Sequence, residues 1–321
     1  MFRLFFVVLV LFAQQTWAQN LSAYPTKPIK LVVPFPPGGV ADIIARPLAE
    51  SLSNYLGQSV VVDNKGGATG TIGASFVANS PADGYTLLLG TANEITMSPT
   101  LFKTLPYDPN TAFTPITPVG DFPNVLVVGP SVTSKNFIEF VELIRSKPGR
   151  ITFASSGTGS TNHLTAVLFA NQAKLDIVNV PYRGGGPALA DLLGGQVDAL
   201  FATLPSAMAQ IKAGKLRALA VTGNVRSGVL PDVPTIKELG IAGVTVTTWN
   251  GVLAPAKLPP KIAKQLHDAI IHVVDEPAFK EKMLAVGVEP STSSAADFSA
   301  RIKTEYEKWS TLIKRSGMTI E

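Results

Sequence analysis

Short apolar runs that alternate with amphipathic stretches constrain the fold of this chain more than any other feature of its sequence. Two of these runs, residues 29–33 and 151–153, each lead through a loop rich in glycine, proline or small hydroxyl residues into a helical pattern. Short, continuously apolar strands between helices are typical of a parallel sheet covered on both faces. The sequence therefore predicts an α/β fold.

The same periodicity extends along the whole chain and predicts its elements. The predicted strands are residues 29–33, 60–62, 86–89, 125–128, 151–153, 177–180, 198–202, 216–221 and 244–248. The predicted helices are residues 41–56, 71–78, 136–146, 161–172, 187–193, 207–213, 260–274, 278–285 and 295–314.

Two proline-containing segments divide this series into two lobes. Residues 106–123 hold five prolines, which disfavour helix and predict an extended first crossing between lobes. A loop with Pro231 and Pro234 predicts the return crossing. We expect residues 24–118 and 225–321 to form lobe 1, and residues 119–224 to form lobe 2. Two lobes joined by two segments can close around a ligand by bending at a few residues.

The N-terminus has the pattern of an export signal. Arg3 precedes an apolar run, residues 4–13, and a small-residue pattern ends at Ala18. The run is shorter than the roughly 20 residues of a membrane span, so we expect residues 1–18 to be a cleaved signal peptide and the protein to be periplasmic. The chain has no cysteine, and its net charge of +4 is scattered, which argues against a nucleic-acid partner.

The loop after the first strand favours an anion. Pro36 and Pro37 fix an extended approach, and Gly38 and Gly39 permit close approach of a ligand. The backbone N–H groups of Gly38, Gly39 and Val40 open a helix, where they and the helix dipole attract negative charge. Asp42, in the first turn, is interpreted as a helix cap, with a ligand contact as the alternative.

The second loop offers hydroxyl groups around two glycines. Its candidates are Ser155, Gly157, Thr158, Gly159, Ser160 and Thr161. Neutral donors of this kind can hold a carboxylate without a lysine or arginine. Together the two loops predict one anion held between two lobes.

His163 follows this second loop and raises the question of catalysis. A Ser160–His163 pair could belong to a hydrolase, but the G-x-S-x-G elbow and an acidic partner are missing. We therefore predict no catalytic residue and interpret His163 as a helix-start histidine that hydrogen-bonds the loop. His267 and His272 are five residues apart, which does not fit a metal site. The glycine-rich stretch at residues 66–73 is neither G-x-G-x-x-G nor a P-loop, so no nucleotide and no other cofactor is expected.

A few further residues follow predicted strands and so become cleft candidates. Asn93, Thr203 and Trp249 are of this kind, and Arg183 either reaches a second carboxylate or lies exposed. The candidate ligand-binding residues are Phe35, Pro37, Gly38, Gly39, Val40, Asp42, Asn93, Ser155, Gly157, Thr158, Gly159, Ser160, Thr161, His163, Arg183 and Thr203.

The same residues carry a family resemblance that runs from about Tyr24 to the C-terminus. The motifs are Pro34–Gly39 with Asp42, Asp83–Leu88, Ser156–Thr161 with His163, Val180–Gly185, Leu193–Asp198, Gly214–Thr222 and Leu230–Thr235. The chain resembles the Bug-type (Bordetella uptake gene) or TctC-like solute receptors, the extracytoplasmic binding proteins of tripartite tricarboxylate transporters.

The resemblance implies a type II periplasmic-binding-protein fold that closes like a flytrap, and a receptor rather than an enzyme. It implies a small carboxylate ligand, an organic acid or acidic amino acid, held by the loops Phe35–Val40 and Gly157–Thr161. The implied partners are transporter membrane subunits or, alternatively, a sensor-kinase ectodomain, and the expected state is a monomer. Glu94 departs from the family's usual small hydroxyl residues, and at the cleft mouth it would disfavour a second carboxylate.

Overall fold

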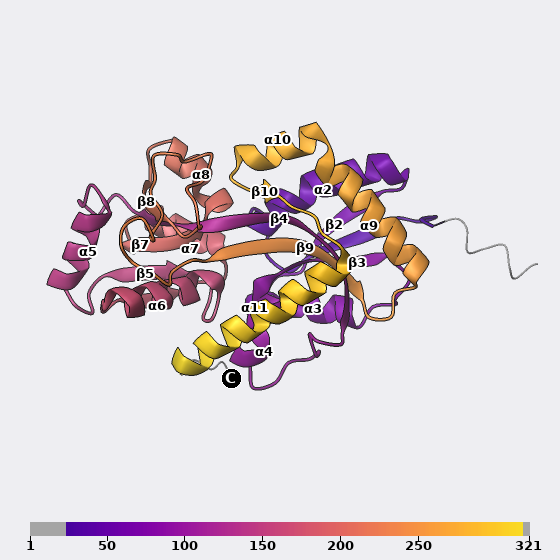
Figure 1. Ribbon diagram of the computed structural model, residues 1–321, viewed down its shortest axis with the longest axis horizontal. Helices are drawn as coiled ribbons and strands as arrows, with labels where there is room; N and C mark the ends of the chain where they lie inside the picture. Colours follow the sequence, from indigo (N-terminus) through magenta and orange to yellow (C-terminus); the bar gives the residue numbers. More distant parts are fainter. Residues whose placement is uncertain (1–23, 317–321) are drawn as a thin grey trace, which may run out of the picture.

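The computed structural model describes residues 24–316 and has two α/β lobes joined by two long strands (Figure 1). The strands are β1 (Ile29–Val33), β2 (Val60–Asn64), β3 (Thr86–Thr91), β4 (Phe113–Val128), β5 (Thr152–Ser155), β6 (Val178–Pro181), β7 (Ala199–Thr203), β8 (Arg217–Val221), β9 (Thr247–Pro255) and β10 (Glu289–Pro290). The helices are α2 (Val40–Leu56), α3 (Thr71–Ala78), α4 (Ser98–Leu101), α5 (Phe137–Ser146), α6 (Thr161–Ala173), α7 (Gly185–Leu193), α8 (Leu204–Lys212), α9 (Pro260–Asp275), α10 (Pro277–Ala285) and α11 (Ala295–Ser316).

The strands follow one another across the molecule in the order β2-β1-β3-β9-β4-β7-β5-β6. β1 pairs in parallel with β2 and β3, and β5 pairs in parallel with β6 and β7. Because every helix in these parallel units starts where a strand ends, the helix starts of both lobes face the space between them.

Lobe 1 contains both ends of the described chain. Leu31 on β1 and Leu48 on α2 are fully buried in one cluster with Ile270 of α9 and Phe279 of α10. A second cluster holds Trp309 of α11. The C-terminal helices α9, α10 and α11 therefore pack on the elements of lobe 1.

An aromatic cluster forms the core of lobe 2. Phe153 on β5 lies 6.0 Å from Phe140, 6.4 Å from Phe169 and 6.0 Å from Phe201, centroid to centroid. All four rings are buried. These contacts pack α5 and α6 against the sheet. The loop after β5 is therefore supported by the core of lobe 2.

The crossing between lobes differs from its prediction. Residues 113–123 of the proline-dense segment and the predicted strand at residues 125–128 form one continuous strand, β4, which pairs antiparallel with β9. The register shifts between Pro115 and Thr117 and between Pro118 and Gly120. Proline lacks an N–H group for the ladder and is accommodated at such bulges, so it did not break the strand.

The return crossing is β9, and not the loop with Pro231 and Pro234. That loop lies beside lobe 2, where Val233 packs on one core cluster and Ile236 is buried in another. The lobe bounds given above stay a prediction, and this packing favours a return to lobe 1 near Thr247.

Four short elements had no signal in the periodicity. After β3 the chain forms a π-helical turn, Asn93–Met97, that runs into α4, and a short 3-10 turn, Ala68–Gly70, precedes α3. β10 adds two residues to the edge of β4. No helix within residues 24–316 is both long and apolar enough to cross a membrane.

Candidate functional site

A pocket lies between the two lobes and is bordered by both crossing strands. Its empty volume, including the part open to solvent, is about 970 Å³. Lobe 1 contributes Phe35, Pro36, Pro37, Gly38, Gly39, Val40, Ala41, Thr91 and Asn93. The crossing strands contribute Phe122, Thr248, Trp249 and Asn250. The rest of the lining is Ser156, Thr161, Asn162, Gly184, Gly185, Gly186, Pro187, Leu189, Leu200, Ala202, Thr203 and Ser206.

Four helices begin at this pocket: α2, α6, α7 and α8. The N-cap residues of α2, α7 and α8 are Gly39, Gly184 and Thr203, and none of the three supplies a side-chain cap. The first N–H groups of a helix have no intrahelical partner, and the helix dipole adds partial positive charge there. The site can therefore hold an anion with backbone groups alone.

Asp42 turns away from the pocket. Its carboxylate accepts hydrogen bonds from the Arg46 guanidinium (2.8 and 2.9 Å), the Asn64 amide (3.1 Å) and the Gly38 N–H (3.0 Å). Burial opposes ionisation, but these hydrogen bonds together hold the pKa of Asp42 below its usual value. The Gly38 N–H, which was predicted to bind the anion, thus donates to Asp42 instead. Of the three predicted N–H groups, those of Gly39 and Val40 remain for the anion.

The second loop contributes fewer hydroxyl groups than predicted. Ser160 caps α6 by accepting a hydrogen bond from the His163 N–H (3.4 Å), and the Ser155 hydroxyl donates to the Gly157 carbonyl (3.4 Å). Ser156 and Asn162 line the pocket instead, with the Ser156 hydroxyl 2.5 Å from Asn162 Oδ1. Turn formation and helix capping thus use the hydroxyls of Ser155 and Ser160.

His163 hydrogen-bonds the loop as predicted. Its Nδ1 accepts from the Gly159 N–H at 3.0 Å. Burial lowers the pKa of His163, which favours the neutral ring that this acceptor role requires. The histidine therefore fixes the loop between β5 and α6.

The two lobes touch at the pocket. Asn93 Oδ1, from lobe 1, accepts a hydrogen bond from the Thr161 N–H at the start of α6, 3.0 Å away. Leu101 packs against Gly159, and Pro36 faces Gly184 across the opening. The structure thus has the lobes closed on one another.

The Gly159–Leu101 contact gives a first prediction. A Cβ added at Gly159 would lie 2.3 Å from Leu101 Cδ1 and 3.0 Å from its Cγ, so the Leu101 side chain must move or the lobes must separate to make room. We expect Gly159→Ala to weaken ligand binding at least about tenfold in calorimetry, since closure would cost on the order of 1.4 kcal/mol more. Gly214→Ala is the control, because Gly214 also has a left-handed φ (+68° against +74°) but open space around it. If Gly159→Ala and Gly214→Ala bound the ligand with equal affinity, the result would contradict ligand binding between closed lobes.

Glu94 does not lie at the mouth of the cleft, where the sequence placed it. It is fully buried in the π-helical turn, and its carboxyl accepts from the Thr91 N–H (2.5 Å) and the Thr91 hydroxyl (2.6 Å). Thr91 and Asn93 line the pocket, whereas Glu94 itself does not. Glu94 therefore supports the pocket wall from behind and does not repel a ligand directly.

The burial of Glu94 predicts a pH dependence of stability. Burial raises the pKa of Glu94 from 4.5 to about 7, although the Thr91 hydrogen bonds oppose the rise. The folded chain then binds more protons than the unfolded chain between these two values, so stability falls as pH rises through this window. We expect Glu94→Gln to remove this loss, which is on the order of 3 kcal/mol by pH 8. The free energies of unfolding of wild type and Glu94→Gln, measured in urea at pH 5 and pH 8, test this prediction. An equal change between the two pH values in both proteins would contradict it.

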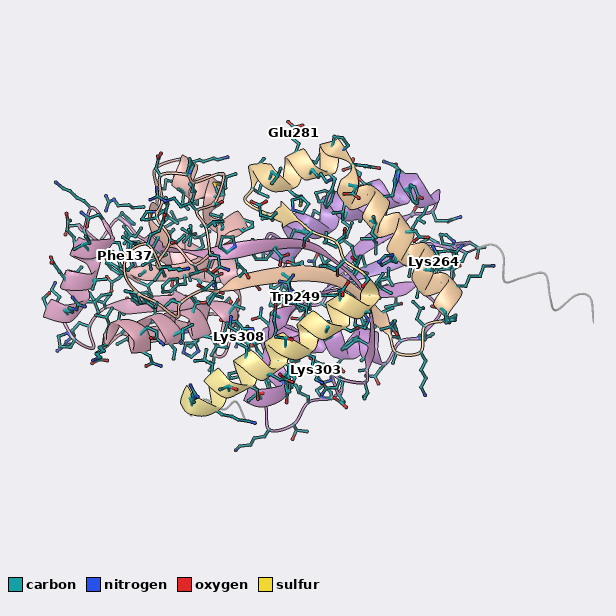
Figure 2. The ribbon with its side chains drawn as sticks, in the orientation of Figure 1. Phe137, Trp249, Lys264, Glu281, Lys303 and Lys308 are labelled. Carbon is teal, nitrogen blue, oxygen red and sulfur yellow. The ribbon has the colours of Figure 1, made fainter. Side chains whose placement is uncertain are left out.

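Trp249 connects the pocket to a charged network outside it. Figure 2 shows Trp249 at the middle of the molecule, between the crossing strands and α11. Its indole N–H donates to Glu305 Oε2 (2.7 Å), and Arg301 Nε donates to the other oxygen of Glu305 (3.0 Å). Arg301 also holds Asp121 on β4, the register partner of Trp249. The network therefore ties both crossing strands to the C-terminal helix.

The structure brings half of the predicted site residues to the pocket. Those that line it are Phe35, Pro37, Gly38, Gly39, Val40, Asn93, Thr161 and Thr203. Those that do not are Asp42, Ser155, Gly157, Thr158, Gly159, Ser160, His163 and Arg183. Arg183 is exposed, as its alternative interpretation stated. That any of these residues binds a ligand stays a prediction.

Several lining residues carried little or no signal in the sequence. Gly184 and Gly185 belong to the motif Val180–Gly185, and Gly184–Gly186 form the start of α7, so the run of glycines after a strand was the available clue. Phe122, Leu189 and Leu200 read as core residues, because an apolar side chain that faces a pocket has the same pattern as one that faces a core.

Comparison with known proteins identifies the family. Residues 44–318 match the family model described as "Tripartite tricarboxylate transporter family receptor". The chain belongs to this family. Protein BugT of Bordetella pertussis is 36% identical over 324 residues, which cover 100% of this chain and 99% of BugT.

Solved structures agree with this assignment. The periplasmic binding protein BugD has 36% identity and a TM-score of 0.88 over 93% of this chain and 100% of its own. An R. palustris protein solved with adipate has 36% identity and a TM-score of 0.89 over 92% of this chain and 99% of its own. The family's proteins are solute-binding receptors of the periplasmic-binding-protein fold, and this chain is accordingly a receptor and not an enzyme.

Proposed function

We propose that this receptor captures a small carboxylate in the pocket between its lobes and delivers it to the membrane subunits of a tripartite tricarboxylate-type transporter. The observation that carries the proposal is the meeting of four helix starts, three without a side-chain cap, at one pocket between the lobes. Backbone N–H groups at helix starts bind carboxylates without a cationic side chain. The related R. palustris protein was solved with adipate, a carboxylate.

Location follows from the family and from the N-terminal pattern. The family's proteins are periplasmic binding proteins. The predicted signal peptide, residues 1–18, lies outside the described residues, and its removal during export to the periplasm is part of the proposal. N-terminal sequencing of protein recovered from a periplasmic extract tests it, and a mature chain that still begins at Met1 would contradict it.

Ligand binding is tested with protein that has been unfolded, dialysed and refolded, so that any acid from the host is removed. Calorimetric titration with a panel of mono-, di- and tricarboxylates should give at least one dissociation constant between tens of nanomolar and micromolar, on the order of −10 to −8 kcal/mol. Refolding is verified by far-UV circular dichroism against protein that was never unfolded. Absence of heat with every acid, from correctly refolded protein, would overturn the proposal.

A further inference from the structure

The buried carboxyl of Glu94 is connected to the pocket by hydrogen bonds. Its Oε1 accepts from the Thr91 N–H (2.5 Å), and its Oε2 accepts from the Thr91 hydroxyl (2.6 Å). Thr91 Oγ1 in turn accepts from the Asn93 N–H (3.1 Å), and both Thr91 and Asn93 line the pocket. The carboxyl of Glu94 therefore acts on the pocket wall through Thr91.

The charge of Glu94 decides which way the Thr91 hydroxyl points. A carboxylate has no hydrogen and can only accept, so the hydrogen of the Thr91 hydroxyl must point at Glu94 Oε2. Thr91 then offers the pocket an oxygen but no donor. A protonated Glu94 has a hydrogen on Oε2, which can donate to Thr91 Oγ1 in the reverse direction. The hydrogen of the Thr91 hydroxyl is then free for an acceptor in the pocket.

An acceptor without a partner belongs to the residue opposite Thr91. Asn250 on β9 is the register partner of Thr91 on β3, and it also lines the pocket. Opposed residues of an antiparallel pair have their side chains on the same face of the sheet. Asn250 Oδ1 is buried and has no hydrogen-bond partner among the described residues. This side of the pocket therefore lacks a donor, and a neutral Glu94 would release one there.

No cationic side chain within residues 24–316 holds Glu94 in its ionised form. The Tyr107 hydroxyl donates to the Glu94 carbonyl (2.8 Å) and is the titratable group that contacts this residue. Three elements that pack on the π-helical turn, β3, α4 and the 3-10 turn, carry no titratable side chain. On α11, the charged side chains that are not exposed are Arg301 and Glu305, which bond to one another and to the crossing strands. Burial therefore raises the pKa of Glu94 to about 7, where both forms are accessible.

We propose that Glu94 takes up a proton when the receptor captures its carboxylate ligand, and that Thr91 connects the two groups. This inference rests on the proposed function and adds a proton linkage to it. The proton comes from the solvent and forms a bond to Glu94 Oε2. The Thr91 hydroxyl keeps its own hydrogen and turns it from Oε2 to the ligand carboxylate, which as an anion is a stronger acceptor than the Asn250 amide oxygen. Glu94 is thus a positioning residue for the ligand.

Affinity should therefore fall as pH rises. The neutral form of Glu94 binds the anion, and this form is already present below the pKa of about 7. Above it the free receptor is ionised, so capture must first restore the proton. Calorimetry on refolded wild-type protein should give a dissociation constant at least about fivefold larger at pH 9 than at pH 6.5, because the hydrogen bond that is gained has a charged acceptor. At pH 8 the heat of binding should differ between phosphate and Tris, because the buffer releases the proton that Glu94 takes up.

The probes are succinate, adipate, hexanoate and benzoate, which are carboxylates over this whole pH range. If refolded protein binds none of the four but binds another acid of the carboxylate panel, that acid takes their place. Failure of every acid of the panel at both pH values would overturn the proposed function instead of this inference.

Glu94→Gln imitates the neutral form at every pH. Its amide oxygen can accept from the Thr91 N–H while its amide N–H donates to Thr91 Oγ1. We expect its dissociation constant to match that of wild type at pH 6.5, to change less than about twofold by pH 9, and to show no difference in heat between the buffers. Glu281→Gln is the control, since it removes a carboxylate from the exposed side of α10 and should keep the wild-type pH dependence (Figure 2).

Two substitutions of Thr91 test its part in the linkage. Thr91→Ser keeps the hydroxyl and should keep the wild-type change of affinity between pH 6.5 and pH 9. Thr91→Val keeps the shape of the side chain without the hydroxyl, so it should bind more weakly at pH 6.5 and lose less affinity by pH 9.

Two results would overturn the inference while leaving the proposed function intact. One is an affinity of wild type that is the same at pH 6.5 and pH 9. The other is an equal loss of affinity with pH in Glu94→Gln and Glu281→Gln, both folded by circular dichroism. If Glu94→Gln does not fold, the pH series of wild type and its heats in the two buffers decide the question.

Discussion

Asn93→Asp should weaken carboxylate binding by about two orders of magnitude. The side chain of Asn93 lies in the pocket lining, and its Oδ1 already accepts the Thr161 N–H at the start of α6. The substitution keeps that hydrogen bond and the shape of the side chain, but it places a negative charge in the pocket where we propose that the ligand's own carboxylate is held. Two like charges about 5 Å apart repel by roughly 3 kcal/mol at an effective dielectric constant of 20.

Two controls separate charge from the loss of a contact. Asn93→Leu removes the hydrogen bond without adding charge, and we expect a loss of about tenfold or less, which is the ordinary worth of one hydrogen bond. Asn171→Asp adds the same charge at an exposed position near the far end of α6 and should leave binding unchanged. Calorimetry with the same acid measures all three proteins. If Asn93→Asp binds as well as Asn93→Leu, the anion is held elsewhere in the pocket.

The sequence was sufficient to predict the α/β fold and most strand and helix positions, because these follow from local periodicity. Ile29–Val33 and the start of the following helix are examples, since continuous apolar residues and a glycine-rich exit are local signals. The two proline-containing segments suggested two lobes, and the family resemblance added their periplasmic-binding-protein form. The prolines of β4 show the limit of prediction from local periodicity. They are accommodated by a bulged pairing with β9, which is distant in sequence.

The site was predicted less completely, for a related reason. A polar residue in a loop serves either the ligand or the loop, and the sequence does not say which. Ser160 and His163 stabilise the start of α6, and Asp42 pairs with Arg46, so none of them is free for a ligand. Glu94 was placed at the mouth of the cleft because it follows a predicted strand, yet two hydrogen bonds from Thr91 hold it inside. The direction of a side chain depends on partners that periodicity does not reveal.

The charged network at the crossing strands should be a large source of stability. Arg301 donates to Asp121 Oδ1 (2.5 Å) and Oδ2 (3.2 Å) and to Glu305 Oε1 (3.0 Å). The Ser291 hydroxyl also donates to Asp121 (2.6 Å). The side chains of Asp121 and Glu305 are only 25% and 17% exposed, so each carboxylate has lost most of its water. The two acids therefore depend on the arginine between them.

We expect Arg301→Met to lower the free energy of unfolding by about 2–4 kcal/mol, since it leaves two mostly buried carboxylates without their cation. Burial already raises the pKa of Glu305 against the opposing effect of Arg301, and without Arg301 it should rise further. In the variant an unpaired carboxylate can become neutral by taking up a proton. The loss in free energy of unfolding relative to wild type should therefore shrink as pH falls from 8 to 5. Urea unfolding of wild type and variant at both pH values measures the two effects.

Arg226→Met is the matched control for this prediction. Arg226 also pairs with a carboxylate, Glu238, but the two side chains are 45% and 46% exposed. Exposed pairs contribute little, so the expected loss is below about 1 kcal/mol. A similar loss in both variants would mean that the Arg301 pairs are worth no more than surface pairs. In that case β4, β9 and α11 would be held together by apolar packing, such as the fully buried contact between Trp249 and Phe298, whose ring centroids are 5.1 Å apart.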